Sequence, residues 1–259
     1  MGIWTIPGGW VEFRPLTGYD ERSIDGLGLF DALALIDRLN RGRPGGLIRP
    51  GEAKSLAAAV RDRVLAVIYT ENYGNVIAAS PRCAKCGELF DLSFLLSDML
   101  QACPLTLSAD GIYQTADGGR FRLPTGEDEL ATFGLAPEAA RQELLRRCML
   151  TEDADPEAVE AAMEAVAPLL SKEIEAACPE CGSRQTADFD LGTYLLRRLL
   201  SDKERLPGEV HTLAQAYGWG LKDILSLTRS ERRRHLTLIE ASAPRSWARQ
   251  GSALRRRSG

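Results

Sequence analysis

The amino-acid sequence predicts an α+β fold that is mainly helical, on the strength of three observations. Apolar residues recur at helical spacing over most of the chain. Two pairs of short alternating runs are each separated by Gly-Gly, which is typical of a β-hairpin. Two Cys-x-x-Cys pairs each follow an expected strand. With 259 residues, 44% of them hydrophobic and 26% charged, the chain is long enough for one large globular domain or two smaller ones.

The hairpins belong to a pattern that occurs twice in the chain. Their expected runs are residues 3–6 with 11–13, and 112–115 with 120–123. After each hairpin comes the motif Thr-Gly-x-Asp-Glu, at 17–21 and at 125–129. A Thr N-cap and acidic residues in the first turn satisfy free N–H groups and complement the helix dipole. We therefore expect each hairpin to lead into a helix.

The apolar pattern then predicts the remaining elements of each copy. Expected helices cover residues 23–39, 52–69, 137–150 and 156–170. Expected strands at 75–79 and 171–177 each lead into one of the cysteine pairs. From Leu191 onward the pattern is helical again, and Pro207 predicts a break in it.

The two cysteine pairs predict one metal site. Each pair provides two thiolates at a spacing that suits one tetrahedral ion, and the four ligands are Cys83, Cys86, Cys178 and Cys181. Gly87 and Gly182 follow the pairs and permit the tight turn of a zinc knuckle. Two disulfides or four free thiols are the alternatives. Because the ligand set has four thiolates and neither histidine is nearby, we expect a single structural Zn²⁺ and no catalytic metal.

Strand, knuckle and strand in each copy give a split zinc ribbon, closed by ligands from both halves. The expected organisation is a duplicated hairpin-helix-knuckle plan in residues 1–100 and 101–190, a C-terminal helical module in 191–245, and a mobile Arg-rich tail in 246–259. The N-terminus lacks a basic region followed by an apolar run, and no window is long enough to span a bilayer. We therefore expect cytoplasmic synthesis and no membrane segment.

The C-terminal module contains a distinctive stretch from Tyr217 to Arg233. Thr228 and Glu231 have the spacing of a capping box. Tyr217 and Trp219 fit either core aromatics at a helix corner or a stacking site for a ligand. Three consecutive arginines, Arg232, Arg233 and Arg234, are expected on a solvated face or on one that meets a neighbouring protein.

This module resembles the baseplate hub and hub-assembly proteins of contractile-tail phages of the T-even type. The residues that carry the resemblance are Leu213-Ala214-x-x-Tyr217-Gly218-Trp219, Ile224, Leu227, Arg229 and Arg233-x-x-Leu236-x-Leu238-Ile239. The segment from Phe13 to Glu21 looks like the start of the same family, whose version with two zinc knuckles is associated with extracellular contractile injection systems.

The resemblance implies a non-enzymatic part of a baseplate, or a factor needed to assemble one. Its partners would be other hub, spike or tube-end proteins, and the chain would join an assembled phage-tail-like particle. The surface expected to contact them comprises Tyr217, Trp219, Arg232, Arg233 and Arg234.

Two other classes of function are considered. A nucleic-acid-binding zinc ribbon is the main alternative, although the net charge is −4 and the knuckles carry few basic residues, chiefly Arg82, Lys85 and Arg184. An enzyme with Cys103 or Cys148 as nucleophile has little support, because Cys148 lies in an apolar helical pattern where a small buried residue is ordinary.

Overall fold

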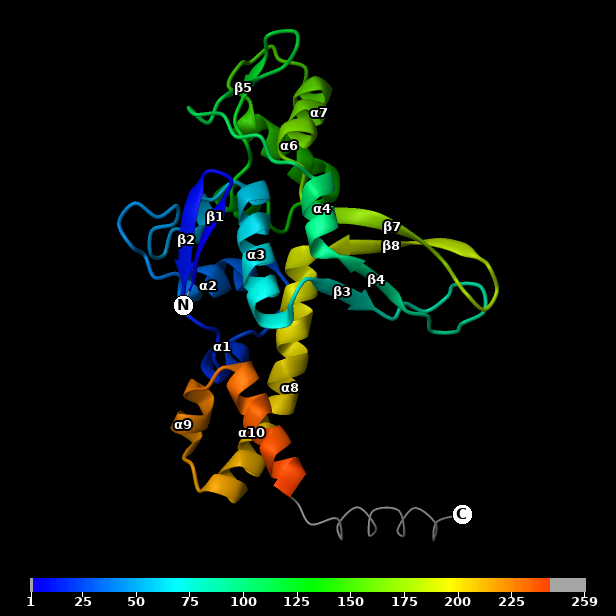
Figure 1. Ribbon diagram of the computed structural model, residues 1–259. Helices are drawn as coiled ribbons and strands as arrows, with labels where there is room; N and C mark the ends of the chain where they lie inside the picture. Colours follow the sequence, from blue (N-terminus) through cyan, green and yellow to red (C-terminus); the bar gives the residue numbers. More distant parts are fainter. Residues whose placement is uncertain (1, 243–259) are drawn as a thin grey trace. The chain divides into compact units, whose positions relative to one another are not determined.

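A computed structural model describes residues 2–242 of the chain, and Figure 1 shows a mixture of helices and small antiparallel hairpins. The α+β class is confirmed. The strands are β1 Gly2–Ile6, β2 Gly9–Phe13, β3 Val76–Ala79, β4 Leu92–Leu95, β5 Tyr113–Gln114, β6 Arg120–Phe121, β7 Ser171–Ala177 and β8 Arg184–Asp190. The helices are α1 Gly18–Arg22, α2 Leu29–Leu39, the 3-10 helix η1 Ala53–Ser55, α3 Ala58–Tyr73, α4 Leu96–Ala102, α5 Gly126–Ala131, α6 Pro137–Cys148, α7 Pro156–Val166, α8 Leu191–Tyr217, α9 Leu221–Ser226 and α10 Arg229–Ser242. The expected tail, 246–259, lies outside the described residues.

The strands form four separate two-stranded antiparallel sheets, β1–β2, β3–β4, β5–β6 and β7–β8. In the first, Gly2 pairs with Phe13 and Ile6 with Gly9, so the turn falls at Gly8, whose φ of +92° favours glycine. Both hairpins predicted from Gly-Gly are present. The expected strand at 171–177 coincides with β7, and the strand at 75–79 is β3 with one residue fewer.

The two copies of the hairpin-helix pattern share the same backbone contacts. The N–H group of Arg14 donates to the carbonyl oxygen of Leu39, and that of Arg122 donates to Cys148, each at 3.0 Å. An isolated bridge pairs Phe13 with Asn40 in the first copy, and the corresponding bridge pairs Phe121 with Met149 in the second. The end of α6 therefore meets its hairpin as the end of α2 meets β2.

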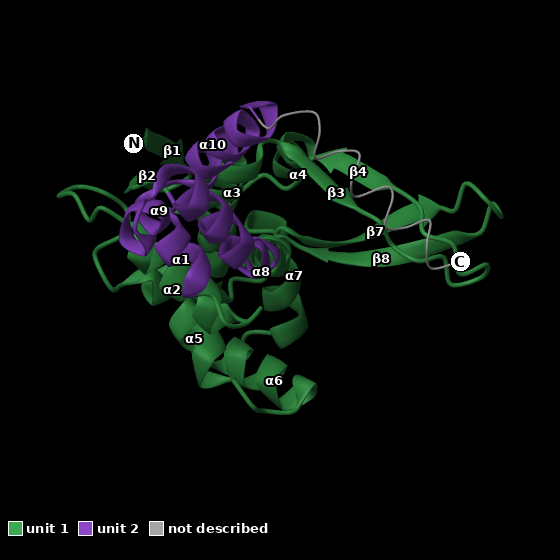
Figure 2. Cartoon of the chain, turned by 90° about the horizontal axis from the view of Figure 1, so that it is seen from below, with its two compact units in different colours: residues 1–15, 24–199 green, residues 16–23, 200–259 purple. Residues whose placement is uncertain are grey.

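The chain divides into two compact units, coloured separately in Figure 2. The first comprises residues 1–15 and 24–199, and the second comprises residues 16–23 and the chain from 200 onward. The two expected halves thus lie together in the first unit, except for 16–23, which belongs with the C-terminal module. Helix α8 crosses the boundary between the units.

Helix α3 is the centre of the first unit. Its residues Tyr69, Val64 and Leu65 are almost fully buried, and so are three consecutive charged residues on the same helix. Arg61 pairs with Glu129 of α5, the Asp62 carboxylate accepts the N–H of Leu170 at 2.8 Å, and Arg63 donates to the carbonyl oxygen of Pro168 at 2.9 Å. These contacts connect α3 to the second copy and to the start of β7.

Several predicted helix boundaries are wrong. The expected helix at 156–170 ends at Val166. The expected helix at 23–39 begins only at Leu29, because the N–H groups of Asp25 and Gly26 bind the Asp31 carboxylate. The expected helix at 52–69 is interrupted after η1 and begins again at Ala58. The predicted break at Pro207 is absent, because α8 continues through it while Leu206 and Leu213 on either side stay buried.

Candidate metal centre

The two cysteine pairs lie in the turns of two hairpins of the first unit. Cys83 and Cys86 lie between β3 and β4, and Cys178 and Cys181 lie between β7 and β8. In each turn the glycine N–H donates to the carbonyl oxygen of the first cysteine at 2.9 Å, from Gly87 to Cys83 and likewise in the second turn. Gly87 has φ of +78° and Gly182 has φ of +68°, so the two turns have the same form.

The four thiol groups converge on one point. All four sulfur atoms lie within 4.8 Å of one another, although the two pairs belong to hairpins far apart in the sequence. The Sγ atoms of Cys83 and Cys181 are 3.6 Å apart, and those of Cys86 and Cys178 are 3.7 Å apart. A tetrahedral ion with metal–sulfur bonds of about 2.3 Å separates its ligands by roughly 3.8 Å. The arrangement therefore fits a four-thiolate metal site, and all six cysteines are free of disulfides.

The electrostatics of the cluster favour a cation. Backbone N–H groups of Cys86 and Lys85 point at the sulfur of Cys83 and lower its pKa to about 6. The pKa of Cys86 is instead raised to about 12, although the N–H of Glu88 lowers it, because desolvation and the three neighbouring thiols disfavour a second thiolate. A divalent cation removes this repulsion and lets all four ligands ionise.

A side chain that the sequence did not reveal connects the two turns. The amide of Gln185 on β8 accepts the N–H of Ala84 at 2.9 Å and donates to the carbonyl oxygen of Arg82 at 3.3 Å. Cys83, Phe90 and Cys178 form a small buried apolar cluster beside it. Gln185 thus bonds to the backbone of the opposite knuckle, a contact that no motif or spacing in the sequence indicates.

Aromatic side chains connect the two hairpins at their bases. The rings of Phe94 on β4 and Phe189 on β8 meet edge to face with centroids 5.1 Å apart. The hydroxyl group of Tyr194, at the start of α8, donates to the carbonyl oxygen of Ala78 at 2.6 Å and accepts its N–H at 3.1 Å. In Figures 1 and 2 the two hairpins extend together away from the helices of the first unit. The cysteine cluster therefore closes the far end of a paired structure that is already held at its base.

The other two cysteines lie apart from this cluster. Cys103 and Cys148 are both buried. Burial raises the pKa of Cys148 to about 11, which keeps its thiol protonated at neutral pH. A protonated, buried thiol is a poor nucleophile.

The aromatic residues of the C-terminal module form a cluster within the second unit. The rings of Tyr217 and Trp219 stack with centroids 4.7 Å apart, and His235 meets both rings edge-on. Tyr217 retains 39% of its accessible surface, and Arg233 and Arg234 are exposed. The capping box predicted for Thr228 and Glu231 is present, with the Glu231 carboxylate accepting the N–H of Thr228 at 2.7 Å.

The expected solvated position of Arg232 is wrong. Its side chain is 1% exposed and forms ion pairs with Glu21 at 2.5 Å and Glu209 at 2.7 Å. The guanidinium group also donates to the carbonyl oxygen of Leu227 at 3.0 Å. Arg232 follows the N-cap Thr228 by four residues, so it points back toward the start of α10, where α1 lies. The internal repeat gives a signal for this position. Arg61 follows the N-cap Ala57 by the same four residues, and it pairs with Glu129, the residue of the second motif that corresponds to Glu21.

Comparison of the chain with models of protein families, with curated proteins and with solved structures found no match. Among residues 2–242, no helix has the length and apolar character needed to cross a membrane.

Proposed function

We propose that the chain is a non-enzymatic structural or assembly protein whose two knuckle hairpins are cross-linked by one zinc ion. The observation that supports this proposal is the convergence of Cys83, Cys86, Cys178 and Cys181 within 4.8 Å. Four thiolates occupy every position of a tetrahedral zinc ion, so no position is left for a water molecule or a substrate. The bound ion would supply a cross-link, and the paired hairpins would form a split zinc ribbon.

The resemblance of the C-terminal module suggests where such a protein acts, namely the hub region of a contractile-tail or injection-system baseplate. In this proposal the contacts with other hub, spike or tube-end proteins involve Tyr217, Trp219, Arg233 and Arg234. Tyr217, Arg233 and Arg234 are exposed and Trp219 is half-buried, which supports the proposal, because accessible Trp, Tyr and Arg side chains often dominate the binding energy of protein interfaces. Arg232 was expected on this surface but is not part of it, because its side chain is buried.

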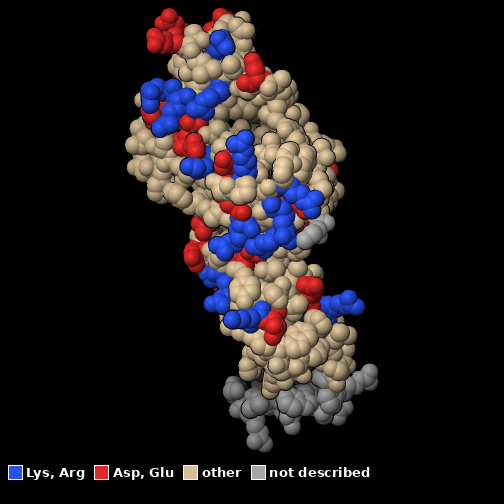
Figure 3. Space-filling view, turned by 90° about the vertical axis from the view of Figure 1, so that its left-hand side faces the viewer, with Lys and Arg blue, Asp and Glu red and all other residues tan. Residues whose placement is uncertain are grey.

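The nucleic-acid-binding alternative receives less support from the distribution of charge. Near the knuckles, the exposed Arg82, Lys85 and Arg184 are accompanied by exposed Glu88 and Glu180. On the face of the molecule in Figure 3, acidic side chains lie among the basic ones. Binding to a phosphate backbone favours a continuous basic surface, which this mixture does not provide.

Two measurements test the proposed function. Metal analysis of the purified chain should find one zinc ion per chain, and its absence under reducing conditions would remove the cross-link. The double variant R233E/R234E should remain folded and zinc-loaded but fail to associate with hub components, whereas the control R197E/R205E, also on exposed positions, should associate normally. Normal assembly of the first variant, with loss of a salt-sensitive affinity for RNA or DNA, would favour the nucleic-acid alternative.

A further inference from the structure

The internal repeat includes a docking contact that occurs in both units. In the first unit, α5 packs against η1 and α2, and its Glu129 pairs with Arg61 near the start of α3. Thr125 forms a bridge with Ala57, and the N–H of Gly126 donates to the carbonyl oxygen of Leu56 at 3.2 Å. A Cβ atom added to Gly126 would lie 3.3 Å from Leu33 of α2, so the short helix occupies a groove between α2 and the start of α3.

The second unit contains the same contact. Thr17 forms a bridge with Thr228, and the N–H of Gly18 donates to the carbonyl oxygen of Leu227 at 3.3 Å. Glu21 pairs with Arg232 as Glu129 pairs with Arg61. In both units, therefore, the glycine of a Thr-Gly-x-Asp-Glu segment donates its N–H to a leucine carbonyl just before a longer helix. The glutamate of the segment pairs with an arginine one turn into that helix.

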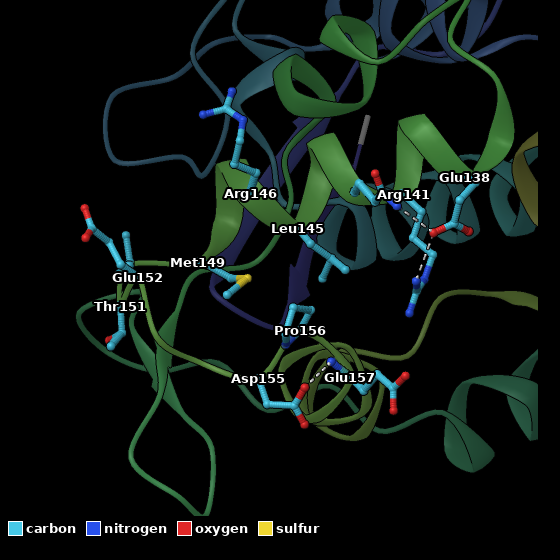
Figure 4. A pocket seen from close by; sticks show the side chains of 12 residues that line it. Glu138, Arg141, Leu145, Arg146, Met149, Thr151, Glu152, Asp155, Pro156 and Glu157 are labelled. Atoms are coloured by element: carbon cyan, nitrogen blue, oxygen red, sulfur yellow. Dashed lines mark hydrogen bonds and ion pairs between the residues drawn. The ribbon is translucent and has the colours of Figure 1, made fainter.

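The repeat contains a third helix start of this kind, at α7. Helix α6 is related to α2 by equivalent backbone contacts with its hairpin, and α7 follows α6 as α3 follows α2. In the described part of the chain, no segment packs there as α5 packs against α3. The structure has instead an open groove of about 900 Å³ between α6 and the start of α7. Figure 4 shows Leu145 and Met149 on one side of this groove and Pro156 on the other.

The groove, which we call the α6–α7 groove, combines an apolar floor with an acidic rim. Its floor includes Leu145, Met149 and Leu150, and the last of these is 49% exposed. Its rim carries the exposed carboxylates Glu138, Glu152 and Glu157.

The two arginines of the rim do not offset this negative charge. Arg141 forms ion pairs with Glu160 and Glu138, and Arg146 forms one with Glu143 at 2.6 Å. Of the three rim carboxylates Glu138 is paired with Arg141, whereas Glu152 and Glu157 form no ion pair with the described residues. These two carboxylates lie beside exposed apolar surface, so the groove favours a positively charged occupant.

Two differences between the start of α7 and the equivalent helix starts indicate that the occupant of the groove differs from α5. Val159 is found four residues after the N-cap Asp155, where α3 has Arg61 and α10 has Arg232, so a glutamate of the occupant would have no partner. Pro156 lacks the N–H that Ala58 donates to Pro124 at 2.9 Å. The acidic Thr-Gly-x-Asp-Glu segment of a second copy would be repelled by the acidic rim.

We propose that the α6–α7 groove is the docking site for a segment of a partner protein that has an apolar anchor and flanking lysine or arginine residues. The apolar anchor would cover Leu145, Met149 and Leu150, and the basic residues would pair with Glu152 and Glu157. This proposal is independent of the zinc site and of the surface around Tyr217, because it depends only on the α6–α7 groove.

The test is a selection of dodecapeptides from a random displayed library on the zinc-loaded full chain. The proposal predicts enriched sequences with an apolar residue flanked by lysine or arginine. Synthetic versions should bind E152K/E157K at least ten-fold more weakly than the parent chain, by fluorescence anisotropy. Their binding should also weaken in L150N, which removes the exposed part of the apolar floor and leaves the charges in place.

The control is E204K/E240K, which reverses two exposed carboxylates outside the groove and should change binding less than two-fold. Circular dichroism of each variant establishes that it is folded. An acidic consensus, a lack of enrichment, or peptides that bind E152K/E157K and L150N as tightly as the parent would each overturn the proposal.

Discussion

At the scale of single residues, buried charges of this protein fix one element to another. Asp128 is the clearest case, with 3% of its surface exposed. Its carboxylate accepts the N–H of Thr125 at 3.0 Å and receives two hydrogen bonds from the guanidinium group of Arg122, at 2.6 and 2.9 Å. Arg122 above all, and then Thr125, hold the pKa of Asp128 well below its usual range. One carboxylate therefore caps α5 and fixes it to the strand that precedes it.

The variant D128N should lower the free energy of unfolding by about 2 kcal/mol at pH 7, because it removes a charge-assisted contact and weakens a helix cap. A depressed folded-state pKa contributes stability above the unfolded pKa of about 3.9 and loses it as the pH falls further. The difference between the two proteins should thus shrink below pH 4. Urea unfolding from pH 7 to pH 3 measures it, with exposed Glu127→Gln as control. A difference that is constant with pH would contradict this role.

Arg232 should be among the most sensitive positions of the second unit. Arg232→Met leaves the buried Glu21 and the half-buried Glu209 without their cation, and breaking a buried ion pair typically costs about 3–5 kcal/mol. The exposed neighbour Arg233, changed in the same way, should alter the free energy of unfolding by less than about 0.5 kcal/mol. Denaturant unfolding followed by circular dichroism compares the two variants. Equal stability of both would mean that the ion pairs contribute nothing.

Sequence reasoning identified the four cysteines that cluster, because metal-binding chemistry requires a fixed local spacing. Cys83 with Cys86, and Cys178 with Cys181, are each separated by two residues, so the motif is visible without a structure. Gln185 was missed, because its two hydrogen bonds reach the backbone of another hairpin. A hydrogen bond from a side chain to a remote segment leaves no trace in local spacing.

At the scale of elements, glycine makes possible the close contact of each Thr-Gly-x-Asp-Glu helix with a short helix, α5 with η1 and α1 with α9. A Cβ atom on Gly126 would lie 3.0 Å from the carbonyl oxygen of Lys54, and one on Gly18 would lie 3.2 Å from that of Leu225. These neighbours are backbone atoms, which cannot move aside as a flexible side chain can. In both copies, therefore, the motif supplies a glycine that permits close backbone approach as well as a helix cap.

Gly126→Ala should consequently destabilise the first unit by roughly 1–3 kcal/mol, the usual cost of overpacking. Gly208 provides the matched control, because it lies inside α8 and an added Cβ would have no neighbour within 4 Å. Gly208→Ala should raise the free energy of unfolding by about 0.5–1 kcal/mol, since alanine favours the helix. Thermal unfolding should therefore shift in opposite directions in the two variants. A shift in the same direction would contradict the close packing of Gly126.

Elements were predicted well where local chemistry determines them and poorly where tertiary contacts do. Gly-Gly turns predicted both N-terminal hairpins of the repeat, and Pro137 and Pro156 predicted the starts of α6 and α7. Asp31 delays α2 by binding the N–H groups of Asp25 and Gly26, and packing carries α8 through Pro207. Both outcomes depend on partners that a local pattern does not contain.

At the scale of the whole molecule, the cysteine cluster closes a long loop. The entropy lost when the two cysteine pairs are brought together grows only logarithmically with the number of residues between Cys86 and Cys178. The length of this loop therefore adds little to the cost of forming a shared site. Without an ion, the hairpins are held by Gln185 and by the aromatic contact of Phe94 with Phe189. The base is therefore packed without any metal, and we expect the turns to depend on the ion.

Metal removal should unfold both knuckle turns together and leave the β1–β2 hairpin intact. Binding of a structural zinc contributes on the order of 10 kcal/mol to folding in small finger peptides, far more than the few contacts that otherwise hold the turns. Hydrogen exchange should show loss of protection in residues 80–91 and 177–184 after chelation. Cys181→Ser should produce the same loss in both turns, and Cys103→Ser, outside the cluster, should not. If Cys181→Ser exposed only the second turn, each knuckle would be an independent structure and the four cysteines would not share one ion.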